Sequence, residues 1–202
     1  MSEKFLLGLD PGGKGCFGWC VVKFRQKPPL EIEISGVADN AGDAFCKAQE
    51  IIKDNELIGV AIDSPLFWHK NGDFRNVDRT LKKNLSDIDP RFANKVMQVN
   101  SLRGGCLMQG IMAARMIRDK YKEVPITESH PTAITAINYE YILDLKGLCN
   151  NEHEIDAAIA CLSAWAMKTK DKEWVDMLLT DTDKKYYKKM VTGRLHYYLP
   201  KL

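Results

Sequence analysis

Acidic residues follow three short apolar runs of the sequence, at positions where a carboxylate could do chemistry. They are Asp10, Asp63 and Glu128. Such runs favour buried strands, and the sites of open α/β sheets gather at the carboxyl ends of the strands. A fourth acid, Asp156, lies in an apolar helical pattern, three residues after His153 and therefore on the same helical face. We expect the four carboxylates to converge.

Converging carboxylates repel each other, and this repulsion limits what the group can do. Two charged carboxylates ~4 Å apart cost on the order of 4 kcal/mol at an effective dielectric constant of about 20. A fold keeps such a group by sharing protons or by binding a cation, and oxygen ligands suit Mg²⁺ or Mn²⁺. Ions held by Asp10, Asp63 and Asp156 could activate water and stabilise the leaving oxygen of a phosphodiester. Glu128 would be a further ligand or a water-orienting base.

Each acid also has an ordinary structural role that fits its position. Asp10 precedes a Pro-Gly pair and could simply start a turn. Glu128 could cap the next helix or pair with Arg103, and Asp156 could be an acid favoured by the helix dipole. For each residue alone these roles fit at least as well, and only the joint pattern favours a site.

The glycine-rich segment at 8–18 matches two phosphate-binding patterns in part. It fits the start of a P-loop, but Gly15 stands where Ser or Thr would hold Mg²⁺, and three of its glycines fit the dinucleotide fingerprint. Both patterns require a helix directly after the loop, whereas the aromatic and β-branched residues at 16–24 favour a strand. We therefore predict a hairpin whose glycines make the turn.

The hydrophobic pattern predicts the elements that must position these residues. Strands are expected at 4–9, 16–24, 30–38, 57–62 and 124–127, and helices after Asn40, at 101–121, at 131–138 and at 152–167. Asn151 and Glu154 have capping-box spacing at the start of the last helix. This order predicts an α/β fold in which a mixed five-stranded sheet begins with an antiparallel meander, continues with α/β crossovers and is covered by helices on both faces.

The regular pattern fails at 67–99, which we interpret as a functional insertion in a domain formed by 1–167. We interpret 168–202 as a helical and basic extension packed on the same domain. Residues 70–103 contain eight basic and four acidic residues, and 168–202 contain nine and five, although the whole chain has a net charge of only +2. Basic flanks around an acidic core suit a metal site approached by nucleic acid, so we expect contacts through these two segments.

Composition excludes several other classes of protein. No run approaches ~18 uncharged apolar residues, so no membrane span is expected, and the first residues lack the apolar stretch of a signal peptide. The six cysteines include no C-x-x-C pair and suggest no zinc site. We expect a cytoplasmic protein.

The order of strands, helices and acids resembles the RNase H-like fold, and His153-x-x-Asp156-Ala looks like the last-helix motif of RuvC-type resolvases. More closely, the chain resembles the family called domain of unknown function 429, regarded as predicted nucleases of RNase H-like fold. The segments that carry the resemblance are Gly8-Leu-Asp10-Pro-Gly, Ala61-Ile-Asp63-Ser-Pro-Leu, Arg75-Asn-Val-Asp78-Arg-Thr-Leu, Glu128-Ser-His130-Pro and Asp156-Ala-Ala-Ile-Ala. The resemblance implies an RNase H-like domain and a metal-dependent nuclease.

The resemblance also suggests a role for the insertion, whose basic residues would contact phosphate and whose aromatic residues Phe67, Trp68 and Phe74 would stack on bases. The residues expected to bind or orient the substrate are Arg75, Asp78, Arg79, Arg103, His130 and His153. Alternatively, the basic residues belong to an ordinary solvated helix, the aromatic residues fix the insertion to the core, and His130 is a turn residue before Pro131.

Two other functions remain open from the sequence. A phosphotransferase related to the actin-like ATPases would share this core and its Asp-Gly first turn, but those proteins resemble two such domains in tandem. A chain of 202 residues would then need to form a homodimer. The other function is a non-catalytic module that binds nucleic acid or protein.

Overall fold

In the computed structural model the sheet begins with the antiparallel meander that the sequence predicted. The strands are β1 (Lys4–Asp10), β2 (Phe17–Lys23) and β3 (Glu31–Ala38). β1 and β2 pair so that Asp10 lies opposite Gly18, and Gly15 in the connecting turn has φ +69°. The hairpin is therefore confirmed, and a strand follows the glycine-rich loop where both phosphate-binding patterns need a helix. The structure describes residues 2–28, 30–67, 74–96, 104–137, 148–179 and 195–201.

Parallel crossovers extend the sheet from the other edge of β1. Helix α1 (Ala41–Ile52) begins at Asn40, whose side chain accepts a hydrogen bond from the backbone N–H of Asp43 at 3.0 Å. The chain then enters β4 (Glu56–Ile62), which is parallel to β1, and α4 (Gly104–Lys120) leads to β5 (Ile126–Glu128), which is parallel to β4. β1 and β4 are apolar because both of their faces are covered.

The predicted count of five strands is wrong, because the C-terminal segment adds two more. β6 (Trp174–Asp176) and η1 (Met177–Leu179) follow the last helix, and β7 (Leu195–Pro200) pairs parallel to β5 and antiparallel to β6. The sheet order is β3-β2-β1-β4-β5-β7-β6. The described part of this segment thus contains two strands that the predicted helical extension did not include. Its side chains alternate between buried and half-buried positions along most of β7, as a strand requires.

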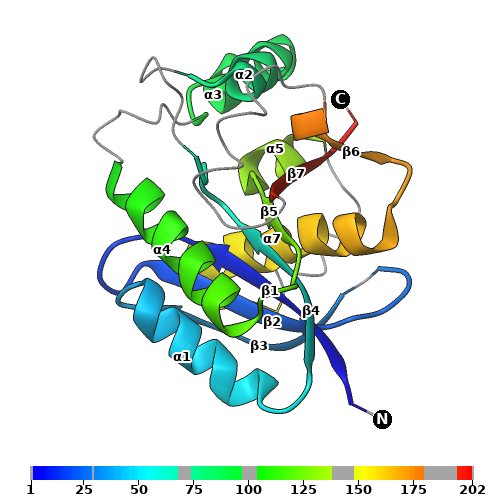
Figure 1. Ribbon diagram of the computed structural model, residues 1–202. Helices are drawn as coiled ribbons and strands as arrows, with labels where there is room; N and C mark the ends of the chain where they lie inside the picture. Colours follow the sequence, from blue (N-terminus) through cyan, green and yellow to red (C-terminus); the bar gives the residue numbers. More distant parts are fainter. Residues whose placement is uncertain are drawn as a thin grey trace.

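Helices cover both faces of this mixed sheet, as predicted. Helices α1 and α4 lie on the front face in Figure 1, and α7 (Glu152–Thr169) lies behind the sheet. The side chain of Asn151 caps α7 by accepting from the backbone N–H of Glu154 at 3.0 Å, which confirms the capping site. Nearly every residue of α7 from Ala157 onwards is buried. The C-terminal part of this helix is therefore enclosed by the rest of the protein.

The insertion forms a small helical layer beyond the ends of the central strands (Figure 1). It contains α2 (Asn76–Ile88) and α3 (Pro90–Ala93), and α5 (Pro131–Ala136) follows β5 nearby. Of the sequence predictions, Arg103, Trp68 and parts of both basic segments lie outside the described residues. Among the helices of the described residues, none has the length and apolar character needed to cross a bilayer.

Candidate active site

A pocket of about 480 Å³ lies where the carboxyl ends of β1, β4 and β5 meet. Its walls include Asp10 at the end of β1, Asp63 just after β4, Glu128 at the end of β5, and Asp156 in the second turn of α7. All four predicted catalytic carboxylates thus line one pocket. Four of the predicted substrate-binding residues also line it, namely Arg75, Asp78, His130 and His153.

Two glycines bring α7 against the sheet at this pocket. A Cβ atom at Gly8 would lie 1.9 Å from the carbonyl oxygen of Ala157, and one at Gly18 would lie 2.1 Å from that of His153. Neither distance is possible for a real side chain, so the close approach of α7 requires glycine at both positions. The N-terminal half of α7 is therefore seated directly on the β1–β2 hairpin, next to Asp10.

A hydrogen bond between Asp10 and His153 joins the end of β1 to the start of α7. The Nδ1 atom of His153 lies 2.9 Å from the Oδ2 atom of Asp10, and their side chains are 31% and 14% exposed. Burial raises the pKa of Asp10 to about 7, against the lowering effect of the His153 hydrogen bond and with a further rise from the charge of Asp156. Proton loss from Asp10 therefore falls near neutral pH.

Asp63 shares this crowded negative environment. Burial raises its pKa well above the ordinary value, and the charges of Asp10 and Asp156 raise it further. The backbone N–H of Asp63 donates to the carbonyl of Leu9 at 2.9 Å, which keeps the residue beside the end of β1. The three carboxylates are thus electrostatically coupled, as the convergence of the sequence pattern implied.

The chemistry of these donors fits a hard dication, because carboxylate oxygens are the ligands that Mg²⁺ and Mn²⁺ prefer. As the side chains are placed, no group of three or more His, Cys, Asp or Glu residues among the described residues is arranged to hold a metal ion. Donor type and electrostatics are therefore the features of Asp10, Asp63 and Asp156 that would favour a dication, and the placement of their side chains is not.

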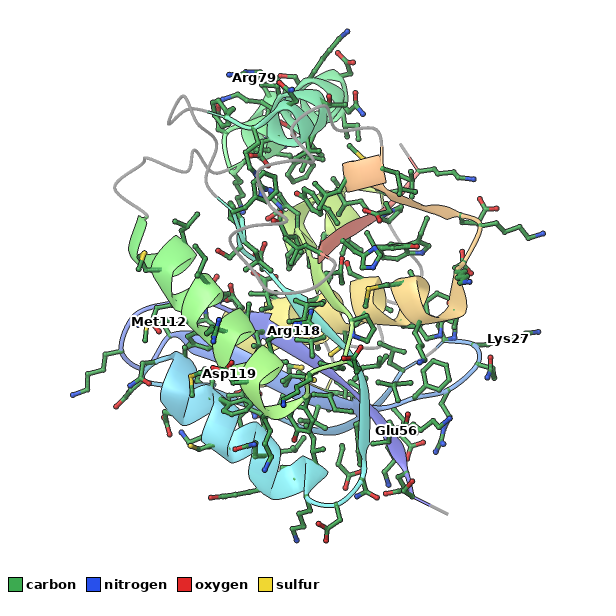
Figure 2. All side chains as sticks on the ribbon, viewed as in Figure 1. Lys27, Glu56, Arg79, Met112, Arg118 and Asp119 are labelled. Atoms are coloured by element: carbon green, nitrogen blue, oxygen red, sulfur yellow. The ribbon has the colours of Figure 1, made fainter. Side chains whose placement is uncertain are left out.

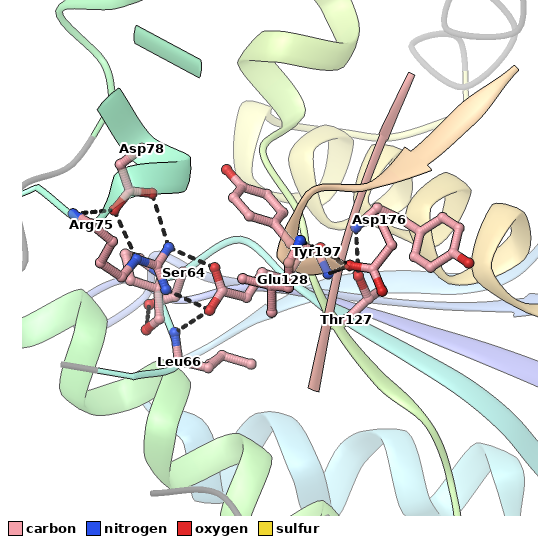
Figure 3. A network of polar contacts seen from close by, with 11 residues as sticks. Ser64, Leu66, Arg75, Asp78, Thr127, Glu128, Asp176 and Tyr197 are labelled. Atoms are coloured by element: carbon pink, nitrogen blue, oxygen red, sulfur yellow. Dashed lines mark hydrogen bonds and ion pairs between the residues drawn. The ribbon is translucent and has the colours of Figure 1, made fainter. Parts of the chain in front are cut away.

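A buried ion network, drawn in Figure 3, forms another part of the pocket wall. Arg75 donates from Nε and Nη2 to Asp78 at 2.7 and 2.9 Å, and from Nη1 and Nη2 to Glu128 at 2.7 Å each. The backbone N–H of Leu66 donates to the same Glu128 carboxylate at 2.8 Å. All three charged side chains are at most 3% exposed. The network joins the start of α2 to the ends of β4 and β5.

Burial alone would lower the pKa of Arg75, but the two carboxylates raise it well above the ordinary value, so the guanidinium stays charged. Burial raises the pKa of Glu128, while Arg75 opposes the rise. The guanidinium also lies 4.4 Å from the ring centroid of Phe67, which is fully buried. Arg75 is thus engaged with protein carboxylates, where a phosphate contact was predicted. Phe67 packs in the core, which agrees with the alternative that the aromatic residues fix the insertion to the core.

Glu128 was predicted to be a metal ligand or a base. In the structure both of its carboxylate oxygens instead accept hydrogen bonds from Arg75. The alternative pairing with Arg103 lies outside the described residues. A pair 53 residues apart in the chain has no local signal, so the sequence could not identify Arg75 as the partner. The only sequence hint was that Arg75 and Asp78 stand three residues apart, the spacing of a helical ion pair.

His130 and Lys95 complete the pocket beside this network. Burial lowers the pKa of His130 to about 4, so its imidazole is neutral at neutral pH. Its Nδ1 atom is buried and has no hydrogen-bond partner among the described residues. Lys95, which no sequence pattern indicated as a site residue, follows α3 and is exposed.

The predicted phosphate contact at Arg79 lies away from the pocket. Arg79 is exposed on the outer side of the α2 layer (Figure 2), and its Nη1 atom donates to Asn76 at 3.1 Å. Lys82 lies on the ring of Phe74, 4.7 Å from its centroid. Neither residue lines the pocket. These charges therefore belong to the outer surface of the insertion.

Comparison of the chain with protein-family models, with curated proteins and with solved structures finds no match.

Proposed function

We propose that the protein is a metal-dependent nuclease or phosphodiesterase with an RNase H-like arrangement of its first five strands. The observation that carries this proposal is the gathering of Asp10, Asp63 and Asp156, from β1, the end of β4 and α7, in one pocket. Burial and mutual repulsion raise the pKa of both Asp10 and Asp63, and a dication would relieve that repulsion. The sequence resemblance supports the same function.

In this proposal Asp10, Asp63 and Asp156 hold Mg²⁺ or Mn²⁺, which when bound activates water and neutralises phosphate charge. His153 orients Asp10 through their hydrogen bond. Arg75, Asp78 and Glu128 hold the insertion against the strand ends, and thereby keep the pocket walls in place. These residues shape the site without binding the phosphate.

The test is hydrolysis of single-stranded and duplex DNA and RNA with Mg²⁺ or Mn²⁺, comparing the wild type with Asp63→Asn. We expect the substitution to lower the rate of hydrolysis by at least about 100-fold. Asp87→Asn is the matched control, because Asp87 is exposed on α2 and outside the pocket. Equal rates for wild type and Asp63→Asn, or no hydrolysis by the wild type, would contradict the proposal.

A further inference from the structure

The insertion contributes to the pocket one positive charge that forms no ion pair with a described residue. Lys95 lies in the turn after α3, where its backbone N–H donates to the carbonyl of Phe92 at 3.0 Å. Its side chain lines the pocket and is exposed. Within the part of the chain that the structure describes, its ammonium group makes no hydrogen bond or ion pair.

The other described cation of the pocket, Arg75, is already paired with carboxylates. Six carboxylates line it, and Arg75 and Lys95 are the only lysine or arginine side chains among the described lining residues. Arg75 directs four side-chain hydrogen bonds to Asp78 and Glu128. Of these two cations, Lys95 is therefore the one available to a ligand.

His130 lies close enough to Lys95 to sense its charge. Burial has the largest effect on the lowered pKa of His130, and the positive charge of Lys95 adds to the lowering. The buried Nδ1 atom of this neutral imidazole has no partner among the described residues. Lys95 and His130 together give this side of the pocket a cation and a hydrogen-bonding atom, while β1, β4 and α7 supply the carboxylates.

We propose that Lys95 binds a phosphate oxygen of the substrate and so holds the phosphate ester between the insertion and the three carboxylates. This inference rests on the proposed function and extends it to a binding residue. A lysine ammonium group is a compact point charge with three donors, suited to phosphate. The pocket volume of about 480 Å³ is in the usual size range of small-ligand sites, so it suits a single phosphate ester group.

The experiment compares wild type with Lys95→Ala and Lys95→Arg. The first readout is Mn²⁺-dependent hydrolysis of the p-nitrophenyl ester of thymidine 5′-monophosphate, with kcat and KM measured separately. The second is equilibrium dialysis of inorganic phosphate in Mg²⁺ buffer. Lys122→Ala is the matched control, because Lys122 is also an exposed lysine in the turn after a helix, and it does not line the pocket.

We expect Lys95→Ala to raise KM and to weaken phosphate binding by about 10- to 100-fold, the range of a charge-assisted hydrogen bond. We expect kcat to change by less than about threefold. Lys95→Arg should retain most of the affinity because it keeps the charge. Lys122→Ala should behave as wild type.

The outcomes separate the two proposals. Unchanged KM and phosphate affinity in Lys95→Ala would overturn the assignment of Lys95 while leaving the proposed function in place. A wild type that hydrolyses nothing, but whose phosphate binding depends on Lys95, would overturn the proposed function alone. A wild type that neither hydrolyses the ester nor binds phosphate would overturn both.

Discussion

The carboxyl group of Asp10 binds its proton more tightly in the folded chain than an ordinary aspartate does. Its pKa of about 7 lies above the ordinary value of 3.8, chiefly because the group is buried. The contribution of Asp10 to the free energy of unfolding is therefore fully present below about pH 4, and it is lost as the pH rises through about 7. At higher pH the charged Asp10 destabilises the fold in the absence of a cation.

Asp10→Asn removes this charge and keeps a similar shape. In metal-free buffer at pH 8 we expect the variant to be more stable than wild type by about 1–3 kcal/mol. The difference should disappear near pH 4, where Asp10 is protonated in the wild type. Urea unfolding at a series of pH values measures the stability difference at pH 8 and near pH 4. A variant less stable than wild type at pH 8 would contradict a destabilising charge on Asp10.

Arg75 is the second residue with a large expected effect. Arg75→Ala leaves Asp78 and Glu128 buried without their cation, which costs about 3–5 kcal/mol in the free energy of unfolding. Arg79→Ala, one turn further along α2 and exposed, should cost less than about 0.5 kcal/mol. Chemical denaturation of both variants gives the comparison, and similar stabilities would mean that the network is not a structural anchor.

The position of the site depends on close packing of α7 against β1 and β2, which glycines in both strands allow. Helix α7 brings His153 and Asp156 to the end of β1 only where Gly8 and Gly18 leave room for its backbone. The distance between α7 and the hairpin is therefore part of the geometry of the site.

Gly18→Ala should push the start of α7 away from β2. We expect a loss of about 1–3 kcal/mol in stability, together with weaker binding of Mn²⁺, because Asp156 moves with the helix. Gly13→Ala is the control, since a Cβ atom there meets nothing within 4 Å. Thermal unfolding and Mn²⁺ titration of the two variants test this, and equal behaviour would show that α7 tolerates the displacement.

Local signals made much of the element order predictable from the sequence. The hairpin follows from glycines between two β-rich runs, and Asn40 and Asn151 mark helix starts because their side chains accept hydrogen bonds nearby in the chain. β6 and β7 were missed because each becomes a strand by pairing with a distant partner. The run at 195–200 has β-type alternation, but its basic surroundings favoured interpretation as a tail.

In the candidate site, too, some features were predictable from the sequence and others were not. The convergence of Asp10 and Asp63 was predictable, because strand order places acids at strand ends on one edge of the sheet. The position of Asp156 beside them depends on the packing of α7 against the β1–β2 hairpin. The Arg75–Glu128 pair and the position of Lys95 depend on how the insertion folds over that edge, which no local pattern encodes.

At the scale of the whole molecule, the C-terminal segment completes the sheet that carries the site. β7 covers the edge of β5, where Tyr197 lies opposite Glu128. Asp176 on β6 accepts hydrogen bonds from the backbone N–H of Tyr197 at 3.0 Å and of Leu178 at 3.2 Å, and lies 2.8 Å from His196. The C-terminal segment and the candidate pocket are thus parts of one structural unit.

A chain that ends at residue 194 should therefore fail to fold cooperatively. It loses β7, leaves the edge of β5 unpaired and removes the partners of Asp176 on β7. A chain that ends at Lys201 keeps β7 and should unfold as the full protein does. Circular dichroism during thermal unfolding distinguishes them, and a cooperative transition in the shorter chain would show that the sheet is stable without β7.

The proposed function requires that Asp10, Asp63 and Asp156 together hold a dication. The most direct measurement is Mn²⁺ binding followed by electron paramagnetic resonance, for wild type, Asp63→Asn and Asp156→Asn, with Asp87→Asn as control. We predict that wild type and Asp87→Asn bind Mn²⁺ alike, and that each of the other variants binds at least about tenfold more weakly. Equal affinity in all four proteins, or no Mn²⁺ binding by the wild type, would contradict the claim.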